Sequence, residues 1–461
     1  MGESYHFIGI GGSGMSGLAR LLLADGVSVT GSDVKESETV RSLRAAGARI
    51  EIGHRAENVA EGTTRVVYTA AVKDDNPELQ EARRRGLPAI LRAQMLGEVM
   101  AGKTGIAIAG THGKTTTTGM AASVFLAAQT DPSILIGGDW SLLGSNARGG
   151  RGRHFLAEAC EAFDSFLELK PHVAVLTNVE ADHLDWHGSL EGVIRAFRRF
   201  LERVDADGYV VGCAEDENVC RLLGEIPQRT VSYAIDCDAD YVASELNLER
   251  RQPSYRLLRR GEALGLVHVG VPGRHNVLNS LAVAAVALEE GLPFEAVAEG
   301  LRRFTGVERR FETLGEVDDI LVLDDYAHHP TEVRATLAAA KASLGRPLTV
   351  VFQPHLFSRT QLLLDDFAVS FGDADRLFVT EIYPAREQPI PGITGALLAS
   401  RVREHAPGQV EHAPDRAALR ERLLAEAKPG DVIITMGAGD VRELGEELAE
   451  RLRERGAVCR G

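Results

Sequence analysis

The segment Gly110–Thr115 reads GTHGKT and lies between an apolar run and a helix-like run. Backbone N–H groups in such a glycine turn can surround phosphate oxygens. Lys114 can place a positive charge on the β- and γ-phosphates, and Thr115 can offer a hydroxyl to Mg²⁺. The turn is shorter than the usual G-x-x-x-x-G-K-[ST] loop. The alternative is a glycine-rich turn with an exposed lysine. We predict an ATP site made of Gly110, Thr111, His112, Gly113, Lys114, Thr115 and Thr116.

Nearer the N-terminus, Gly9-x-Gly11-x-x-Gly14 forms another cluster, called the first glycine cluster below. It also lies between a strand-like and a helix-like run, and Asp33 closes the next strand. Glycines there allow a tight turn next to a pyrophosphate, and the acid is placed to meet a ribose hydroxyl. The pattern fits a dinucleotide, another pyrophosphate such as a UDP-sugar, or a turn without a ligand. Two phosphate turns in one chain favour phosphoryl transfer or ligation over hydride transfer.

Carboxylates and a histidine follow two predicted strands that come after the segment Gly110–Thr115. HFLAEA leads to Glu158 and Glu161, and VLTNV leads to a polar group that contains His183. The members of this group are Asn178, Glu180, Asp182, His183 and Asp185. Ligands bind beyond the carboxyl ends of parallel strands, and a carboxylate with an imidazole can complete a Mg²⁺ shell, although oxygen donors are the usual ligands. His183 is therefore either a metal ligand or a structural histidine.

Strand-length apolar runs alternate with helix-length periodic segments, which is typical of parallel sheets covered by helices. The expected strands include YHFIGI, VSVTGSD, RVVYTAAV, TGIAIAG, HFLAEA, VAVLTNV, GYVVGCA, ILVLDD, LTVVFQP, RLFVTEI and DVIITMG. The expected helices include Ser16–Ala24, Thr115–Ala128, Asn276–Glu290 and Phe294–Phe304. In the polar stretch 236–260 short antiparallel strands are the alternative to irregular chain. We predict an α/β protein with three domains, at 1–102, 103–308 and 309–461.

The composition of the chain argues against nucleic-acid binding, membrane insertion and zinc binding. The formal net charge of −15 argues against broad nucleic-acid binding. No apolar run is long enough for a bilayer and no secretory signal opens the chain, so we expect no membrane partner and a cytoplasmic location. The five cysteines form no C-x-x-C pair and are expected to be reduced thiols rather than zinc ligands.

Motifs along nearly the whole chain resemble those of the ATP-dependent Mur ligases of peptidoglycan synthesis. They are GTHGKTT, the pair Glu158/His183, GRHNVLNSLAV, RRFE, IGIGGSGMSG, DNPEL, SNAR, DDYAHHPTEV, FQPHLFSRT, YPAREQPIPG and MGAGDV. The resemblance implies a Rossmann-like N-terminal domain that binds a UDP-sugar and a central P-loop-type ATPase domain with a mainly parallel sheet. It also implies a Rossmann-like C-terminal domain that binds the amino acid and completes the ATP site.

The resemblance also implies roles for individual residues. Mg²⁺ is expected near Thr115, Glu158 and His183. Further ATP contacts are expected from His275, Asn276 and Asn279 near the adenine, Arg310 on the phosphates and Asp325 on the ribose. The UDP-sugar is expected to contact Gly11, Gly12, Ser13, Gly14, Met15, Ser16, Asp33, His54, Tyr326 and Arg359. The expected catalytic residues are Lys114, Glu158, His183, Arg310 and His328.

The chain departs from the usual family pattern in three segments. In the segment that resembles E-A-D-E-S-D, Cys160 replaces an acid and Phe163 replaces a serine. Leu356 stands where F-Q-P-H-R has arginine, and Gln94 stands where R-R-A-E has glutamate. Glu158 and Arg359 are retained, so we expect the metal site and one substrate cation to survive.

The implied reaction is amide ligation. ATP phosphorylates the lactyl carboxylate of UDP-N-acetylmuramic acid, and the amine of L-alanine attacks the acyl-phosphate. Lys114, Arg310 and Mg²⁺ would neutralise the transferred group, and His328 would orient or deprotonate the amine. The expected cofactors are ATP and Mg²⁺, and the chain is expected to be a monomer or weak homodimer. The alternatives are a sister Mur ligase, a peptide-recycling ligase, an NAD-dependent oxidoreductase and a catalytically silent nucleotide-binding regulator.

Overall fold

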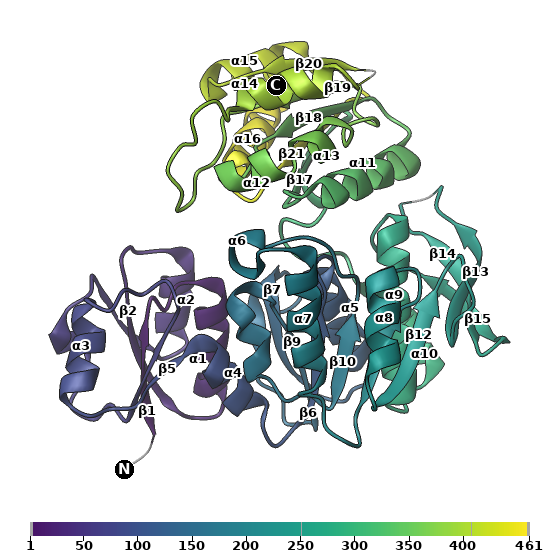
Figure 1. Ribbon diagram of the computed structural model, residues 1–461. Helices are drawn as coiled ribbons and strands as arrows, with labels where there is room; N and C mark the ends of the chain where they lie inside the picture. The colour runs from purple at the N-terminus through teal and green to yellow at the C-terminus, as the bar shows by residue number, and fades with distance from the viewer. Residues whose placement is uncertain (1–2, 250, 407, 459–461) are drawn as a thin grey trace. The chain divides into compact units, whose positions relative to one another are not determined.

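The computed structural model describes residues 3–249, 251–406 and 408–458 (Figure 1). Its strands form three sheets that follow one another along the chain, each accompanied by helices. None of the helices in the described ranges is long and apolar enough to cross a bilayer. The three-domain α/β prediction is confirmed.

The first sheet has five parallel strands in the order β3-β2-β1-β4-β5. Its strands are β1 (Ser4–Ile8), β2 (Ser28–Asp33), β3 (Arg49–Ile52), β4 (Arg65–Tyr68) and β5 (Ala89–Leu91). Its helices are α1 (Ser13–Ala24), α2 (Glu38–Ala45), η1 (Ala56–Asn58), α3 (Pro77–Arg84) and α4 (Arg92–Met100). The strand order reverses at β1, so the glycine cluster after β1 lies where open sheets of this kind bind ligands.

The second sheet has ten strands in the order β15-β14-β13-β12-β11-β10-β6-β9-β7-β8. Its first strands are β6 (Thr104–Ala109), β7 (Ser133–Trp140), β8 (Ser145–Arg148), β9 (His154–Glu158) and β10 (Val173–Leu176). The others are β11 (Tyr209–Cys213), β12 (Arg229–Ala234), β13 (Tyr241–Asn247), β14 (Ser254–Arg259) and β15 (Glu262–His268). Strands β9, β6, β10 and β11 are parallel neighbours, and β8 is antiparallel to β7.

The helices of this part are α5 (Lys114–Ala127), η2 (Ala162–Glu168), α6 (Leu184–His187), α7 (Leu190–Leu201), α8 (Glu217–Glu225), α9 (Arg274–Glu289) and α10 (Phe294–Arg303). The strands β10 and β11 are buried along their whole length. Burial on both faces explains why these strands are continuous apolar runs in the sequence. The stretch 236–260 forms β13 and β14, so it contains strands rather than only irregular chain. Strand β13 pairs parallel with β12, which precedes this stretch.

The third sheet has six strands in the order β16-β17-β21-β18-β19-β20. Its strands are β16 (Glu312–Val317), β17 (Ile320–Asp325), β18 (Leu348–Phe352), β19 (Arg376–Val379), β20 (Gln409–His412) and β21 (Val432–Met436). Its helices are α11 (Pro330–Leu344), α12 (Phe357–Leu362), α13 (Leu364–Ala368), α14 (Gly395–Arg403), α15 (Arg416–Glu426) and α16 (Val441–Val458). Only β16, antiparallel to β17, departs from the parallel arrangement within the described residues.

The chain divides into two compact units. The first comprises residues 1–244, 256–267 and 278–304, and the second comprises 245–255, 268–277 and 305–461. Within the first unit, Asn146 Nδ2 donates a hydrogen bond to the carbonyl of Ser13 at 2.6 Å. A Cβ on Gly17 would lie 2.2 Å from Leu135 Cδ1, so α1 packs closely against β7. One hydrophobic core thus joins the first sheet to the second, while the exact domain boundaries stay a prediction.

Candidate active site

The segment Gly110–Thr115, called the ATP turn because we predict that it binds ATP, lies between β6 and the first residues of α5. Two of its glycines are required by their surroundings. Gly110 has φ +139°, and a Cβ there would lie 1.9 Å from Thr177 Oγ1. Gly113 has φ +83°, and a Cβ there would lie 2.8 Å from Asn279 Oδ1. Asn279 therefore lies directly against the turn. The sequence predicted the turn from its glycines, whereas contact of Asn279 with the adenine stays a prediction.

Lys114, the first residue of α5, lies inside this turn. Its Nζ donates to the carbonyls of Gly110 and Thr111 and forms an ion pair with Glu161 Oε2 at 3.0 Å. Burial alone would lower the pKa of Lys114, but nearby carboxylates, Glu161 first, raise it above its ordinary value. Lys114 is therefore a cation whose partners are oxygen acceptors, the class to which phosphate oxygens belong.

Glu158 ends β9, next to β6, and its register partner is Ile108 near the end of β6. The carboxylate accepts a hydrogen bond from Gly137 N at 3.0 Å. A Cβ on Gly137 would lie 2.4 Å from Glu158 Oε2, so only glycine leaves space for the carboxylate. The backbone thus fixes Glu158 with oxygen atoms available to a hard cation.

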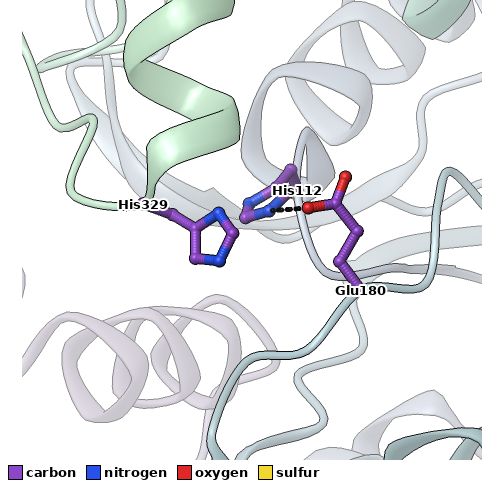
Figure 2. Close-up of side chains that lie close together, drawn as sticks. All are labelled: His112, Glu180 and His329. Atoms are coloured by element: carbon purple, nitrogen blue, oxygen red, sulfur yellow. Dashed lines mark ion pairs between the residues drawn. The ribbon is translucent and has the colours of Figure 1, made fainter. Parts of the chain in front are cut away.

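The loop after β10 carries His183, which begins α6 in a left-handed conformation with φ +51°. His183 Nε2 lies 3.9 Å from Glu161 Oε1 and 3.9 Å from Asp182 Oδ2. Earlier in this loop, Glu180 pairs with His112 Nε2 of the ATP turn at 3.5 Å (Figure 2). The carboxyl ends of β9, β6 and β10 therefore meet at one edge. Joint coordination of Mg²⁺ by Thr115, Glu158 and His183 stays a prediction.

A cavity of about 330 Å³ extends from the first glycine cluster to Glu158. It is lined by Ser13 and Gly14 from the first cluster and by Gly137 and Glu158 from the central sheet. The remaining lining residues are Arg92, Ala93, Leu96, Leu135, Ile136, Cys160, Ser165, Phe166 and Leu169. A substrate that holds its pyrophosphate at the first cluster can thus present another group to Glu158.

Arg92 is a site residue that the motif analysis missed. A Cβ on Gly14 would lie 2.9 Å from Arg92 Cδ and 3.0 Å from its Nη1, so the guanidinium lies over the glycine turn. A guanidinium there matches the geometry and charge of a pyrophosphate. Glycine spacing carries no signal for a cation about eighty residues away, and the signal that could have found it is the segment Leu91–Gln94, which resembles the family's R-R-A-E.

The other predicted UDP-sugar residues of the first unit have different surroundings. Asp33 Oδ2 accepts a hydrogen bond from Gly11 N at 2.8 Å, so this acid holds the glycine turn in place. Met15 and Ser16 are buried in α1, and Ser16 Oγ donates to the carbonyl of Ser13 at 3.0 Å. Gly12 N donates to the carbonyl of Gly9 at 3.2 Å within the turn. Their contacts with a ligand stay predictions.

The second unit gathers polar residues at the carboxyl end of β17. Asp325 accepts hydrogen bonds from the backbone N–H groups of Phe311 and Ala327, both at 2.8 Å. Burial raises the pKa of Asp325 to about 6 despite these bonds and the nearby Arg310. The Arg310 guanidinium lies 5.0 Å from the centre of the Tyr326 ring. Asp325, Arg310 and Tyr326 are thus neighbours, and their contacts with ATP and the substrate stay predictions.

His328 and Arg359 belong to an aromatic group on the same edge. The rings of His328 and His355 lie 5.9 Å apart, and His355 stacks on Tyr383 at 5.7 Å. Arg359 Nη1 lies 3.3 Å from His355 Nδ1, and burial, with the charge of Arg359, lowers the pKa of His355 to about 4. His355 and Tyr383 were missed as site residues, although both lie within motifs that carried the family resemblance.

His275 and Asn276 open α9 in the second unit. Asn276 Nδ2 donates to the carbonyl of Pro272 at 2.6 Å, which attaches the start of this helix to the preceding turn. Burial, and then the charge of Arg310, lower the pKa of His275 to about 4, so this imidazole is neutral. Their contact with adenine stays a prediction.

Three family models match the chain in succession. They are "Mur ligase family, catalytic domain" at residues 4–104, "Mur ligase middle domain" at 108–287 and "Mur ligase, glutamate ligase domain" at 309–439. The chain therefore belongs to the Mur ligase family. This membership replaces the NAD-dependent oxidoreductase alternative.

Particular relatives are similar over nearly the full length. The UDP-N-acetylmuramate–L-alanine ligase of Geotalea daltonii is 46% identical, covering 98% of both chains, and that of Geobacter sulfurreducens is 47% identical at the same coverage. The solved UDP-N-acetylmuramate-alanine ligase of Thermotoga maritima has a TM-score of 0.83 at 30% identity, covering 98% of this chain and 99% of that one. A murein peptide ligase from Psychrobacter arcticus has a TM-score of 0.70 at 28% identity, with the same coverage.

Proposed function

We propose that this protein is an ATP-dependent ligase that joins L-alanine to the lactyl carboxylate of UDP-N-acetylmuramic acid through an acyl-phosphate. One structural observation supports the chemistry: the ends of β9, β6 and β10 place Glu158, Lys114 and the His183 loop at one edge. The substrate assignment is supported by relatives named for this reaction at 46–47% identity. We propose a cytoplasmic location and a monomer or weak homodimer.

The three predicted domains divide the work in this proposal. Residues 1–102 bind the UDP-sugar, 103–308 bind ATP, and 309–461 bind the amino acid and complete the ATP site. Thr115, Glu158 and His183 would hold Mg²⁺, and the fixed carboxylate of Glu158 fits a hard cation. When bound, Mg²⁺ supplies Lewis-acid stabilisation of phosphate charge.

Side chains of the protein stabilise the charge of the phosphates and position the nucleotide sugar. Lys114 exchanges its carbonyl and carboxylate partners for phosphate oxygens and stabilises the charge of the transferred group. Arg92 holds the pyrophosphate, so the lactyl group extends into the cavity toward Glu158. Arg310 supplies a second cation to the phosphates. Enclosure by the cavity walls limits hydrolysis of the acyl-phosphate.

His328 has the proton arrangement that a base for the amine requires. Its Nδ1 lies 2.9 Å from the carbonyl of Tyr326 and 3.2 Å from Glu332 Oε2, and both partners are acceptors. Nδ1 therefore carries the proton, and the lone pair of the neutral ring is on Nε2. Glu332 would stabilise the imidazolium that forms after proton transfer.

The decisive experiment measures phosphate release from ATP and Mg²⁺ with UDP-N-acetylmuramic acid and L-alanine, L-serine, glycine or a muramyl peptide in turn. We expect release that depends on both substrates, is strongest with L-alanine and yields a product of the ligated mass. Release only with a peptide would move the chain to the peptide-recycling ligases, which the likeness to the Psychrobacter arcticus structure makes the nearest alternative. No release with any pair would favour a silent regulator.

Lys114→Ala separates chemistry from substrate binding. We expect turnover to be lost while UDP-N-acetylmuramic acid still binds, because Lys114 belongs to the ATP turn. Lys170→Ala, which removes an exposed lysine, is the matched control and should retain turnover. Substantial ligation by Lys114→Ala would refute the assigned role.

A further inference from the structure

A completely buried carboxylate lies beneath the carboxyl edge of the first sheet. Glu78, in the first turn of α3, has a side chain with no exposed surface. Its Oε1 accepts from Asn58 Nδ2 at 2.6 Å and from Arg55 N at 3.2 Å. Its Oε2 accepts from Ser32 Oγ at 2.6 Å and lies 3.2 Å from His6 Nε2. Burial alone would raise the pKa of Glu78, but these hydrogen bonds lower it, so the carboxylate is ionised.

This carboxylate holds the turn that carries His54. Arg55 N binds Glu78 directly, and Asn58 Nδ2 bridges Glu78 to the carbonyl of Gly53 at 2.9 Å. The same turn is attached to the sheet, because Gly53 N donates to the carbonyl of Asp33 at 2.8 Å. The backbone on both sides of His54 is therefore fixed.

The hydrogen bonds among Glu78, Ser32 and His54 also determine which nitrogen of the His54 ring carries the proton. Ser32 Oγ has one hydrogen, and an ionised carboxylate can only accept, so Ser32 donates to Glu78. Ser32 Oγ must then accept from His54 Nδ1, which lies 2.9 Å away. His54 Nδ1 therefore carries the proton, and the neutral ring has its lone pair on Nε2. The His54 side chain is 23% exposed, so a ligand can reach the ring.

The network adjoins the first glycine cluster. The carbonyl of Ser32 accepts hydrogen bonds from Gly9 N and Ile10 N, both at 2.9 Å. Glu78, Ser32 and His54 thus connect the buried interior to the edge where a nucleotide sugar is expected to bind.

We propose that Glu78 is a positioning residue for nucleotide-sugar binding, which acts through Ser32 to present His54 Nε2 as a hydrogen-bond acceptor to an N–H donor of the substrate. This inference rests on the proposed place of His54 in the UDP-sugar site. Two N–H donors of UDP-N-acetylmuramic acid fit this chemistry, the uracil imide and the sugar acetamide. A ring with the opposite tautomer would present a donor to a donor and weaken binding.

The variant Glu78→Gln reverses the direction of the hydrogen bonds that run from His54 through Ser32 to residue 78. The amide NH₂ cannot face Arg55 N and Asn58 Nδ2, because a backbone N–H cannot become an acceptor. The NH₂ therefore faces Ser32, whose hydroxyl rotates, accepts from the amide and donates to His54 Nδ1. The proton of His54 then moves to Nε2. We expect the dissociation constant for UDP-N-acetylmuramic acid to rise about tenfold or more, with kcat at saturating substrate within about twofold.

The experiment combines ¹⁵N NMR of the histidine rings with binding titrations. We expect His54 to carry its proton on Nδ1 in the unaltered protein and on Nε2 in Glu78→Gln. An unchanged tautomer in that variant, or an Nε2 proton in the unaltered protein, would overturn the inference. If Glu78→Gln does not fold, Ser32→Ala replaces it, because Ser32→Ala removes the relay and leaves the contacts of Glu78 with the turn. Unchanged binding of UDP-N-acetylmuramic acid by Ser32→Ala would overturn the inference equally.

The binding titrations show whether the uracil imide or the sugar acetamide donates to His54. They also distinguish an error in the role of Glu78 from an error in the placement of His54 at the substrate. Weaker binding of UDP alone by Glu78→Gln assigns the uracil imide, and weaker binding of only the complete nucleotide sugar assigns the acetamide. Unchanged binding of both ligands despite a reversed tautomer would overturn the role of Glu78. His54→Ala distinguishes the underlying assumption: if it binds the nucleotide sugar normally while the tautomer reversal occurs, the error lies in placing His54 at the substrate.

Discussion

Gly137→Ala tests the metal site without changing any proposed ligand. Gly137 belongs to β7, and its backbone conformation is accessible to alanine, since its φ is not in the left-handed region. The added Cβ would lie 2.4 Å from Glu158 Oε2 and 2.8 Å from Oε1. The alanine methyl therefore competes directly with the carboxylate proposed to bind Mg²⁺.

The size of the effect follows from these distances. A Cβ does not approach another heavy atom within 3.0 Å, so the Glu158 carboxylate must move by at least about 0.6 Å, the difference between 3.0 and 2.4 Å. Metal–ligand distances tolerate only about 0.2 Å, and a misplacement of about 1 Å can cost about 10²-fold in rate. We expect half-saturating Mg²⁺ to rise about tenfold and kcat/KM to fall between about tenfold and 10²-fold. Stability should change by less than about 1 kcal/mol, because the displaced atoms end a flexible side chain.

The assay is phosphate release at fixed ATP across a Mg²⁺ titration, with urea unfolding measured in parallel. Gly224→Ala is the matched control, because a Cβ there has no neighbour within 4 Å and Gly224 lies in α8. It should keep the Mg²⁺ dependence and gain about 0.5–1 kcal/mol from helix propensity. A wild-type Mg²⁺ dependence in Gly137→Ala would refute the placement of Glu158 at the metal.

Three further predictions concern the helix starts and the ATP turn. The pKa of His275 is about 4 in the folded chain and about 6.5 in the unfolded chain, so the unfolded chain binds the proton more tightly. The contribution of His275 to the free energy of unfolding is therefore complete above pH 6.5 and decreases as the pH falls. Urea unfolding should show a loss of about 3 kcal/mol between pH 6.5 and pH 4 that His275→Gln removes. Gly113→Ala places a Cβ 2.8 Å from Asn279 Oδ1 at φ +83° and should abolish ATP binding in calorimetry, with UDP-sugar binding retained. Asn76→Ala removes the cap that accepts from two backbone N–H groups of α3 and should lower the unfolding free energy in urea by about 1 kcal/mol.

The parts of the fold that the sequence predicted well are those buried on two faces. The strands β10 and β21 are continuous apolar runs because helices cover both sides of their sheets. The strand β15 is mostly exposed and follows no clear alternation, so its pattern resembles that of a loop. The glycine turns were predictable for a local reason, since a left-handed φ or a missing Cβ restricts the residue type directly.

The parts of the site that the sequence did not predict depend on tertiary packing. Arg92 reaches the first glycine turn from α4, and Tyr383 stacks on His355 from a separate loop. Glu78 is a surface residue by its type and is buried only because donors from β1, β2 and the turn after β3 converge on it. No periodicity marks such residues, because their partners are distant in sequence.

The replacement of a family acid by Cys160 changes the charge beside the ATP turn. Cys160 lines the cavity with Glu158, and burial raises the pKa of its thiol, so the group is neutral where the usual family pattern has an acid. Glu161 remains to pair with Lys114 and is itself almost completely buried. One negative charge fewer lies beside the turn that must receive a triphosphate. Phe163, the second departure, has an exposed ring 5.3 Å from that of Trp186 and takes no part in this charge balance. The two departures therefore differ in kind: Cys160 changes the electrostatics at the ATP turn, whereas Phe163 changes packing beside it.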